Sequence, residues 1–70
     1  MTEIKGTVHK LSKGGSFTLR SKGINYEIDW NSRVPIGEQV TVNGKTVVRR
    51  KGDDSTPVRE IKAASVTVHR

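Results

Sequence analysis

Residues 37–50 read Gly-Glu-Gln-Val-Thr-Val-Asn-Gly-Lys-Thr-Val-Val-Arg-Arg, and the interpretation of this run decides the fold. Valines alternate with polar residues, and β-branched side chains flank the central glycine, a pattern that favours a pleated strand over a helix. The pair Asn43-Gly44 leaves two interpretations open. A type I′ turn there would split the run and give six strands, whereas a glycine bend within one strand over 38–50 gives five. We favour the long strand, because the polar segment 51–57 already supplies the next turn.

The same two-residue alternation of apolar and polar side chains recurs along the rest of the chain, and no segment carries a helical apolar stripe. The glycine-rich segment 12–16 and the pair Lys22-Gly23 mark turns between alternating runs. We therefore expect one all-β domain over 1–70, a small five-stranded antiparallel barrel, because closing a short sheet removes its edges. An SH3-like barrel is the alternative architecture. The expected strands are 3–11, 16–22, 24–30, 38–50 and 58–69.

The charge balance is the main compositional signal for function. Thirteen lysines and arginines against seven acidic residues give a net charge of +6 and an isoelectric point near 10.2. A small, strongly basic domain suggests a polyanionic partner, most often nucleic acid. The chain has no cysteine, which excludes disulfides and thiolate metal sites, and it has no apolar run long enough to cross a membrane as a helix. Its first ten residues lack an apolar leader segment, so we expect a cytoplasmic protein without membrane contact.

Three local patterns resemble the oligonucleotide/oligosaccharide-binding (OB) fold. The run 4–8 resembles an opening strand with an internal glycine, 37–50 resembles the fourth strand of anticodon-binding OB domains, and 61–68 resembles their closing strand. In size and layout the chain is also similar to the translation initiation factor 1 family. One departure concerns 30–37, which is too short for the helix that usually follows the third strand. We expect a loop or a single turn there, with Trp30, Val34 and Ile36 closing the barrel bottom.

The sequence gives little support for a catalytic function. His9 and His69 occupy polar positions in the alternation of the first and last strands. Glu27 and Asp29 form a carboxylate pair of the kind usually found on a solvated strand face. The pair Gly14-Gly15 lacks both the P-loop pattern and a following helix. We therefore expect a protein that is not an enzyme, with no catalytic residue, no metal and no cofactor.

The resemblance implies that a ligand crosses the second and third strands between the first and last loops. We expect a single-stranded DNA or RNA there, bound through its phosphates with weak sequence preference, and we expect the positive side chains to gather on one flank. Trp30 is the candidate for stacking on a base, whereas Phe17 and Tyr26 share the apolar phase of their strands. Glu27 and Asp29 would repel a polyanion, which keeps a protein-interaction module without nucleic-acid binding as the alternative. The candidate nucleic-acid-binding residues are Lys10, Lys13, Arg20, Lys22, Trp30, Arg49, Arg50 and Lys51.

Overall fold

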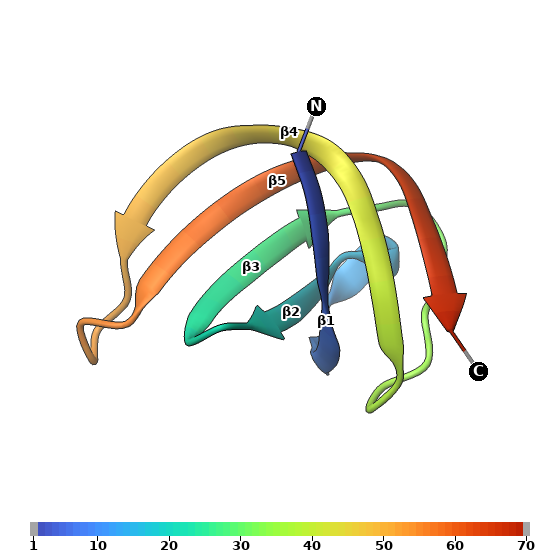
Figure 1. Ribbon diagram of the computed structural model, residues 1–70, viewed down its shortest axis with the longest axis horizontal. Coiled ribbons are helices and arrows are strands. Elements are labelled where there is room, and N and C mark those ends of the chain that lie inside the picture. Colours follow the sequence, from blue (N-terminus) through green and yellow to red (C-terminus); the bar gives the residue numbers. More distant parts are fainter. Residues whose placement is uncertain (1, 70) are drawn as a thin grey trace.

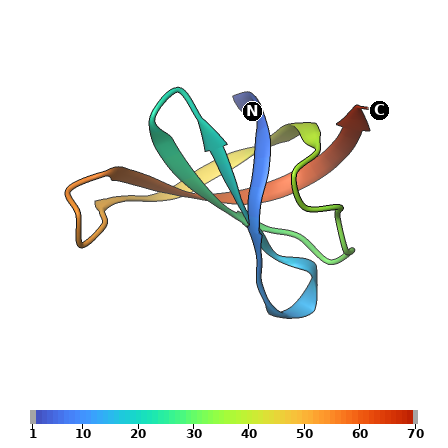
Figure 2. The ribbon, with the colours of Figure 1, turned by 90° about the horizontal axis from the view of Figure 1, so that it is seen from below.

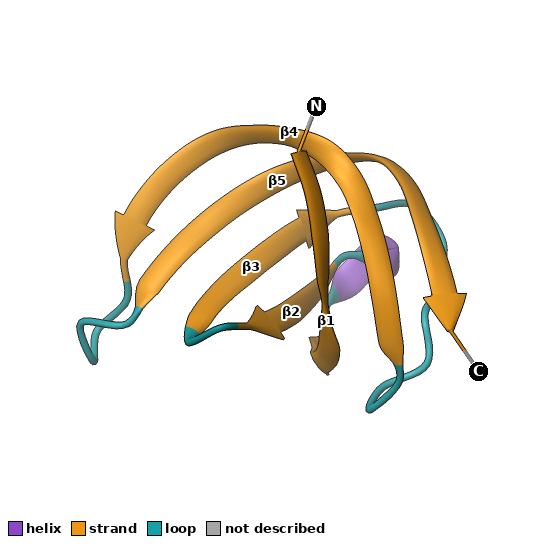
Figure 3. Cartoon of the chain, viewed as in Figure 1, coloured by secondary structure: helices purple, strands orange, loops and turns teal. Residues whose placement is uncertain are grey.

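Five strands wrap into a closed barrel in the computed structural model, which describes residues 2–69 (Figure 1). The strand ends lie within one residue of those expected from the alternation of apolar and polar side chains. A single 3-10 turn, η1, follows the first strand, and no helix occupies 30–38 (Figure 3). The elements are β1 (Thr2–Leu11), η1 (Lys13–Gly15), β2 (Phe17–Ser21), β3 (Ile24–Asp29), β4 (Gln39–Lys51) and β5 (Pro57–His69).

The strand order around the barrel is β1-β2-β3-β5-β4, and β4 closes the barrel by pairing with β1. The expected all-β barrel is thus confirmed, but the expectation of an antiparallel sheet is wrong for one pair. β3 and β5 run parallel, with Glu27 opposite Glu60, while the other four pairs are antiparallel. Parallel neighbours need a crossover connection, and β4 provides it by running antiparallel to β5 before the chain returns beside β3.

The long strand β4 spans the Asn43-Gly44 pair without turning back. Its pairing with β5 shifts register between Asn43 and Gly44 and again between Thr46 and Val48, so the strand bends over the barrel as an arch (Figure 1). A side chain cannot be placed at the bend. A Cβ added to Gly44 would lie 2.4 Å from the carbonyl oxygen of Lys62. The glycine therefore permits the close approach of two backbones, and the five-strand interpretation is confirmed.

The inward-facing residues of all five strands form one core. Phe17 and Leu19 from β2 are almost completely buried, together with aliphatic residues of the other strands. Val34 closes one end of the barrel, and Trp30 packs partly buried against the core, as expected for the short connection. The expectation fails for Ile36, whose side chain is 61% exposed. The core cluster comprises Ile4, Val8, Phe17, Leu19, Ile28, Val34, Val40, Val42 and Ile61.

The connections fall at two ends of the barrel. Lys22 and Gly23 both have positive φ and join β2 to β3 in a two-residue turn, as the hairpin signal predicts. This turn and the β4–β5 loop, residues 52–56, lie at one end, whereas residues 12–16 and the connection 30–38 lie at the other (Figures 1 and 2). The placement of the loops thus separates residues that the sequence analysis assigned to one site.

Candidate nucleic-acid interface

Basic residues lie at the end of the barrel that carries both the β2–β3 turn and the β4–β5 hairpin. The strand registers place Arg20, Asn25, Val58 and Arg50 side by side across β2, β3, β5 and β4. Arg20 Nε donates a hydrogen bond to Asn25 Oδ1 at 3.2 Å, which fixes one guanidinium at the rim. Arg49 and Arg59 are opposite each other one position nearer the barrel, so their side chains point to the other face of the hairpin. We define the basic end as Arg20, Lys22, Arg49, Arg50, Lys51 and Arg59.

A second row, adjacent to the first, carries the opposite charge. Thr18, Glu27, Glu60 and Val48 are neighbours across the same four strands. Arg50 reaches from the basic end into this row, where its Nη2 lies 2.7 Å from both carboxylate oxygens of Glu27 and its Nε lies 3.2 Å from Glu60 Oε2. Parallel pairing of β3 with β5 thus brings two carboxylates together, and one guanidinium bridges them.

These contacts determine the electrostatic state of Arg50. Hydrogen bonds to Glu27, and secondly to Glu60, raise the pKa of Arg50 above its ordinary value. The guanidinium is thus charged at every pH of interest, but its donors are directed at protein carboxylates. A phosphate group would have to compete with both glutamates for this arginine, so Arg50 contributes less to an anion site than the other basic residues.

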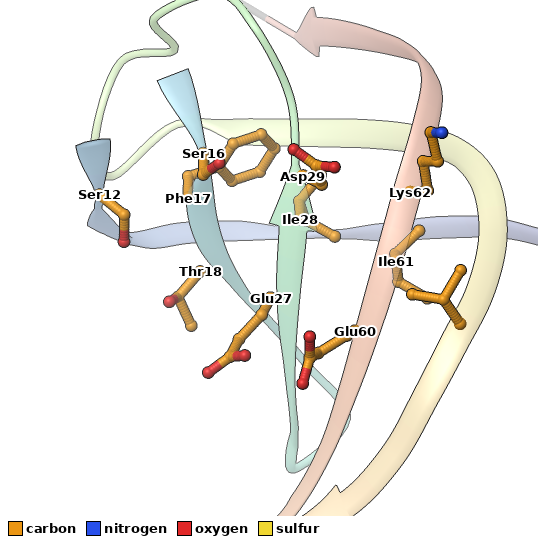
Figure 4. Close-up of a pocket in the computed structure, with 11 residues that line it drawn as sticks. Ser12, Ser16, Phe17, Thr18, Glu27, Ile28, Asp29, Glu60, Ile61 and Lys62 are labelled. Carbon is orange, nitrogen blue, oxygen red and sulfur yellow. The ribbon is translucent and has the colours of Figure 1, made fainter. Parts of the chain in front are cut away.

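A hollow of about 460 Å³ lies beyond the acidic row, between residues 12–16 and strands β2, β3 and β5. Figure 4 shows the carboxylates of Glu27 and Glu60 close together at one end of this hollow, with Asp29 and Lys62 towards the other. Among residues 2–69, Lys62 is the only basic side chain that lines it. Arg50 already pairs with Glu27 and Glu60, and with Asp29 and Lys62 the hollow keeps a small excess of negative charge, which makes it unfavourable for a phosphate backbone.

The structure divides the residues that the sequence analysis selected. Arg20, Lys22, Arg49, Arg50 and Lys51 are together at the basic end. Lys10 and Lys13 lie at the opposite end of the barrel, where Lys13 and Arg33 line a smaller hollow of about 110 Å³. Trp30 comes directly after β3 and packs against the core, so its ring is only partly accessible. Five of the seven selected basic residues thus lie at one end of the barrel, but they do not share one face, because successive side chains of β4 alternate and Arg49 and Lys51 point away from the face that carries Arg50.

The β4–β5 loop places two acidic residues, Asp53 and Asp54, beside the basic end. The backbone N–H of Thr56 donates to Asp54 Oδ1 at 3.0 Å. This hydrogen bond, then the Thr56 hydroxyl and finally the positive charge of Arg20, lower the pKa of Asp54. Asp54 orders the loop through its contact with Thr56 and partly offsets the positive charge beside it.

Sequence reasoning did not select Arg59 or Glu60. Both occur in the alternating run that opens β5, but their importance depends on the parallel register with β3, which places Glu60 opposite Glu27. Strand patterns define which side chains share a face within one strand, and they do not define which strand is adjacent. Glu60 could have been selected only by assuming the strand order.

Some classes of site have no counterpart in the part of the chain that the structure describes. Across residues 2–69 there is no group of three or more histidine, aspartate or glutamate side chains arranged to hold a metal ion. The same residues include no helix with the length and apolar character needed to span a membrane. No protein-family model matches the sequence, and neither the curated proteins nor the solved structures contain a significant match.

Proposed function

We propose that this protein binds nucleic acid, single-stranded DNA or RNA, through phosphate contacts at the basic end. The observation that carries the proposal is that the β2–β3 hairpin and the β4–β5 hairpin both bring basic residues to one end of the barrel, in addition to the ion-paired Arg50. A cluster of this kind attracts a phosphate backbone by releasing the counterions condensed on it. The net charge of +6 supports the same partner class.

The binding mode follows from what the surface lacks. Phe17 is buried, and Tyr26 and Trp30 pack against the core, so the three aromatic rings give little area for base stacking. Stacking is the main source of affinity in many single-strand binders. Without it, binding depends on electrostatic contacts, and we propose weak sequence preference together with a strong dependence on salt.

The strand order supports an OB-type barrel more than an SH3-like one. Insertion of β5 between β3 and β4 gives a Greek-key order, which is the arrangement of the OB fold. We propose kinship with the anticodon-binding and initiation factor 1 types of this fold on that basis. Ligands of OB folds cross β2 and β3 between the first and last loops. In this chain the acidic hollow occupies part of that path, so we place the ligand at the β4–β5 side of it.

Fluorescence titration of oligothymidine and oligouridine at several salt concentrations tests the proposal. Four or five phosphate contacts should give a log–log slope of about −3, because a single strand contributes about −0.7 for each contact. Replacing Arg20, Lys22 or Lys51 singly by alanine should reduce the magnitude of the slope by about 0.7. Arg33→Ala, an exposed cation at the opposite end of the barrel, is the matched control and should leave the slope unchanged.

Two outcomes would contradict the proposal. Absence of binding at low salt, or binding that does not respond to salt, would exclude a phosphate interface. Losses in Lys10→Ala and Lys13→Ala that equal those of Arg20→Ala would show that the ligand spans the acidic hollow, and the assignment to the basic end would be wrong.

A second candidate function is a protein-interaction module. Glu27 and Glu60, bridged by Arg50, occupy the middle of the sheet face on which an OB ligand is expected, and a mixed-charge surface suits a protein partner better than a polyanion. The double variant Arg49→Glu with Lys51→Glu separates the two functions. If it stays folded and loses oligonucleotide binding, the first function is supported, whereas unchanged oligonucleotide binding would favour the second.

A further inference from the structure

Half of β4 has no neighbour on one side. Pairing with β1 ends at Thr2 opposite Gly44, whereas pairing with β5 continues as far as Lys51 opposite Pro57. Beyond Gly44, the strand therefore has β5 on one side and no strand of the described chain on the other, as the arch in Figure 1 shows. Backbone N–H and C=O groups that point away from β5 in the segment 45–51 have no ladder partner.

This open edge has a defined chemical character. Val47 and Val48 are 56% and 42% exposed, respectively, and they are flanked by the cations of the same segment. Val47 is the extra residue at the second register shift and also lines the large hollow. An added strand would thus meet apolar side chains at its centre and positive charges towards both ends. The cations of the segment are Lys45, Arg49, Arg50 and Lys51.

The charges determine which kind of strand fits. Two copies of the segment 45–51 paired edge to edge in antiparallel register would place Lys45 opposite Lys51, and like charges directly opposite each other destabilise a sheet. The cations thus act against self-association, in the manner of other protected edges. The same cations favour an added strand that carries carboxylates. The backbone groups along the edge would supply the hydrogen bonds by which a sheet recognises an added strand.

We propose that the open edge of β4, residues 45–51, receives an extended acidic segment of another protein, which adds to the barrel as a further strand. The partner segment alternates carboxylates with apolar residues, so that its apolar side chains contact Val47 and Val48. This inference does not depend on nucleic-acid binding, because it uses the backbone groups of the strand edge, which a phosphate backbone cannot pair with as a ladder.

A synthetic ten-residue peptide of alternating valine and aspartate, blocked at both ends, is the probe. Addition of this peptide to the full chain should slow amide exchange in residues 45–51 and leave the other strands unchanged. A twin peptide methylated at every backbone nitrogen keeps the charges and loses every backbone N–H donor on both edges. It should bind roughly tenfold more weakly or worse, since each lost bond is worth about 1 kcal/mol. A peptide with lysine in place of aspartate should not bind.

Three results would overturn the proposal. Equal affinity for the methylated twin would show that the edge acts only as a positive surface. Protection of the same amides by oligothymidine, to the extent given by the acidic peptide, would assign the segment to nucleic acid. Protection that rises with protein concentration alone, with a dimer in analytical ultracentrifugation, would identify a second copy of the chain as the occupant.

Discussion

Replacement of Gly44 by alanine tests the reasoning about the fold most sharply. The new Cβ would lie 2.4 Å from the carbonyl oxygen of Lys62 and 2.9 Å from Cγ2 of Ile61. Ordinary van der Waals contact begins about 1 Å further away than the first of these distances. The carbonyl belongs to a central strand, because Lys62 is paired with β3 and with β4 at the same time. It cannot move without disturbing both ladders.

The magnitude follows from these contacts. Overpacking costs about 1–3 kcal/mol, and one or two weakened ladder hydrogen bonds add about 0.5–1.5 kcal/mol each. Alanine also restricts the backbone of the unfolded chain, which offsets this destabilisation by about 0.4–1 kcal/mol. We expect Gly44→Ala to lower the free energy of unfolding by about 2–4 kcal/mol, a large part of the roughly 4–10 kcal/mol usual for this chain length. The corresponding fall in Tm is about 8–30 °C.

Urea and thermal unfolding followed by circular dichroism measure this loss. Gly52→Ala is the matched control, because a Cβ there would have no neighbour closer than 3.4 Å and the backbone does not have a positive φ. Its stability should equal or slightly exceed that of the parent protein. If Gly44→Ala is as stable as the parent to within about 0.5 kcal/mol, the close approach of β4 and β5 at the bend does not require a glycine there, and the reasoning fails.

Three further predictions concern the core, the loop and the charged face. Leu19→Ala should cost about 2–5 kcal/mol in urea unfolding, because the side chain is fully buried, whereas alanine at the exposed leucine that ends β1 should cost little. The Asp54 carboxyl, whose pKa is lowered by the Thr56 amide, should titrate below the same carboxyl in the unfolded chain by NMR. The stabilisation of the loop is then present at neutral pH and lost as the pH falls through the folded pKa, and coincident folded and unfolded titrations would refute this. The double variant Glu27→Gln with Glu60→Gln should bind oligothymidine roughly threefold to tenfold more tightly by fluorescence titration, since it releases the bridging arginine, and unchanged affinity would argue against an interface beside the acidic row.

The sequence was sufficient to predict each strand but not the arrangement of the strands. Alternation within a strand is a local property, so the strand limits, the Lys22-Gly23 turn and the long β4 could all be predicted. The pairing of β3 with β5 depends on a connection that includes the whole of β4, and no local pattern records its direction. The parallel register, and with it the meeting of Glu27 and Glu60, therefore required the structure.

The candidate site was likewise predictable from the sequence only in part. Arg49, Arg50 and Lys51 are consecutive, so their common location was predictable, and the OB resemblance placed Arg20 and Lys22 near them. Assigning Lys10 and Lys13 to the same surface ignored the length of the sheet face, since those residues are at the other end of the barrel (Figure 2). Ile36 was misjudged because a β-branched residue next to proline in a short connection looks like a core residue, yet only Val34 reaches the interior.

Amide chemical-shift changes on addition of a short oligothymidine or oligouridine at low salt give the most direct test of whether the basic end binds nucleic acid. We expect the largest shifts in residues 20–25 and 49–59, on the two adjacent hairpins, with small changes in 10–16. Absence of any shift, or shifts confined to 10–16 and the residues around the acidic hollow, would contradict the proposed function.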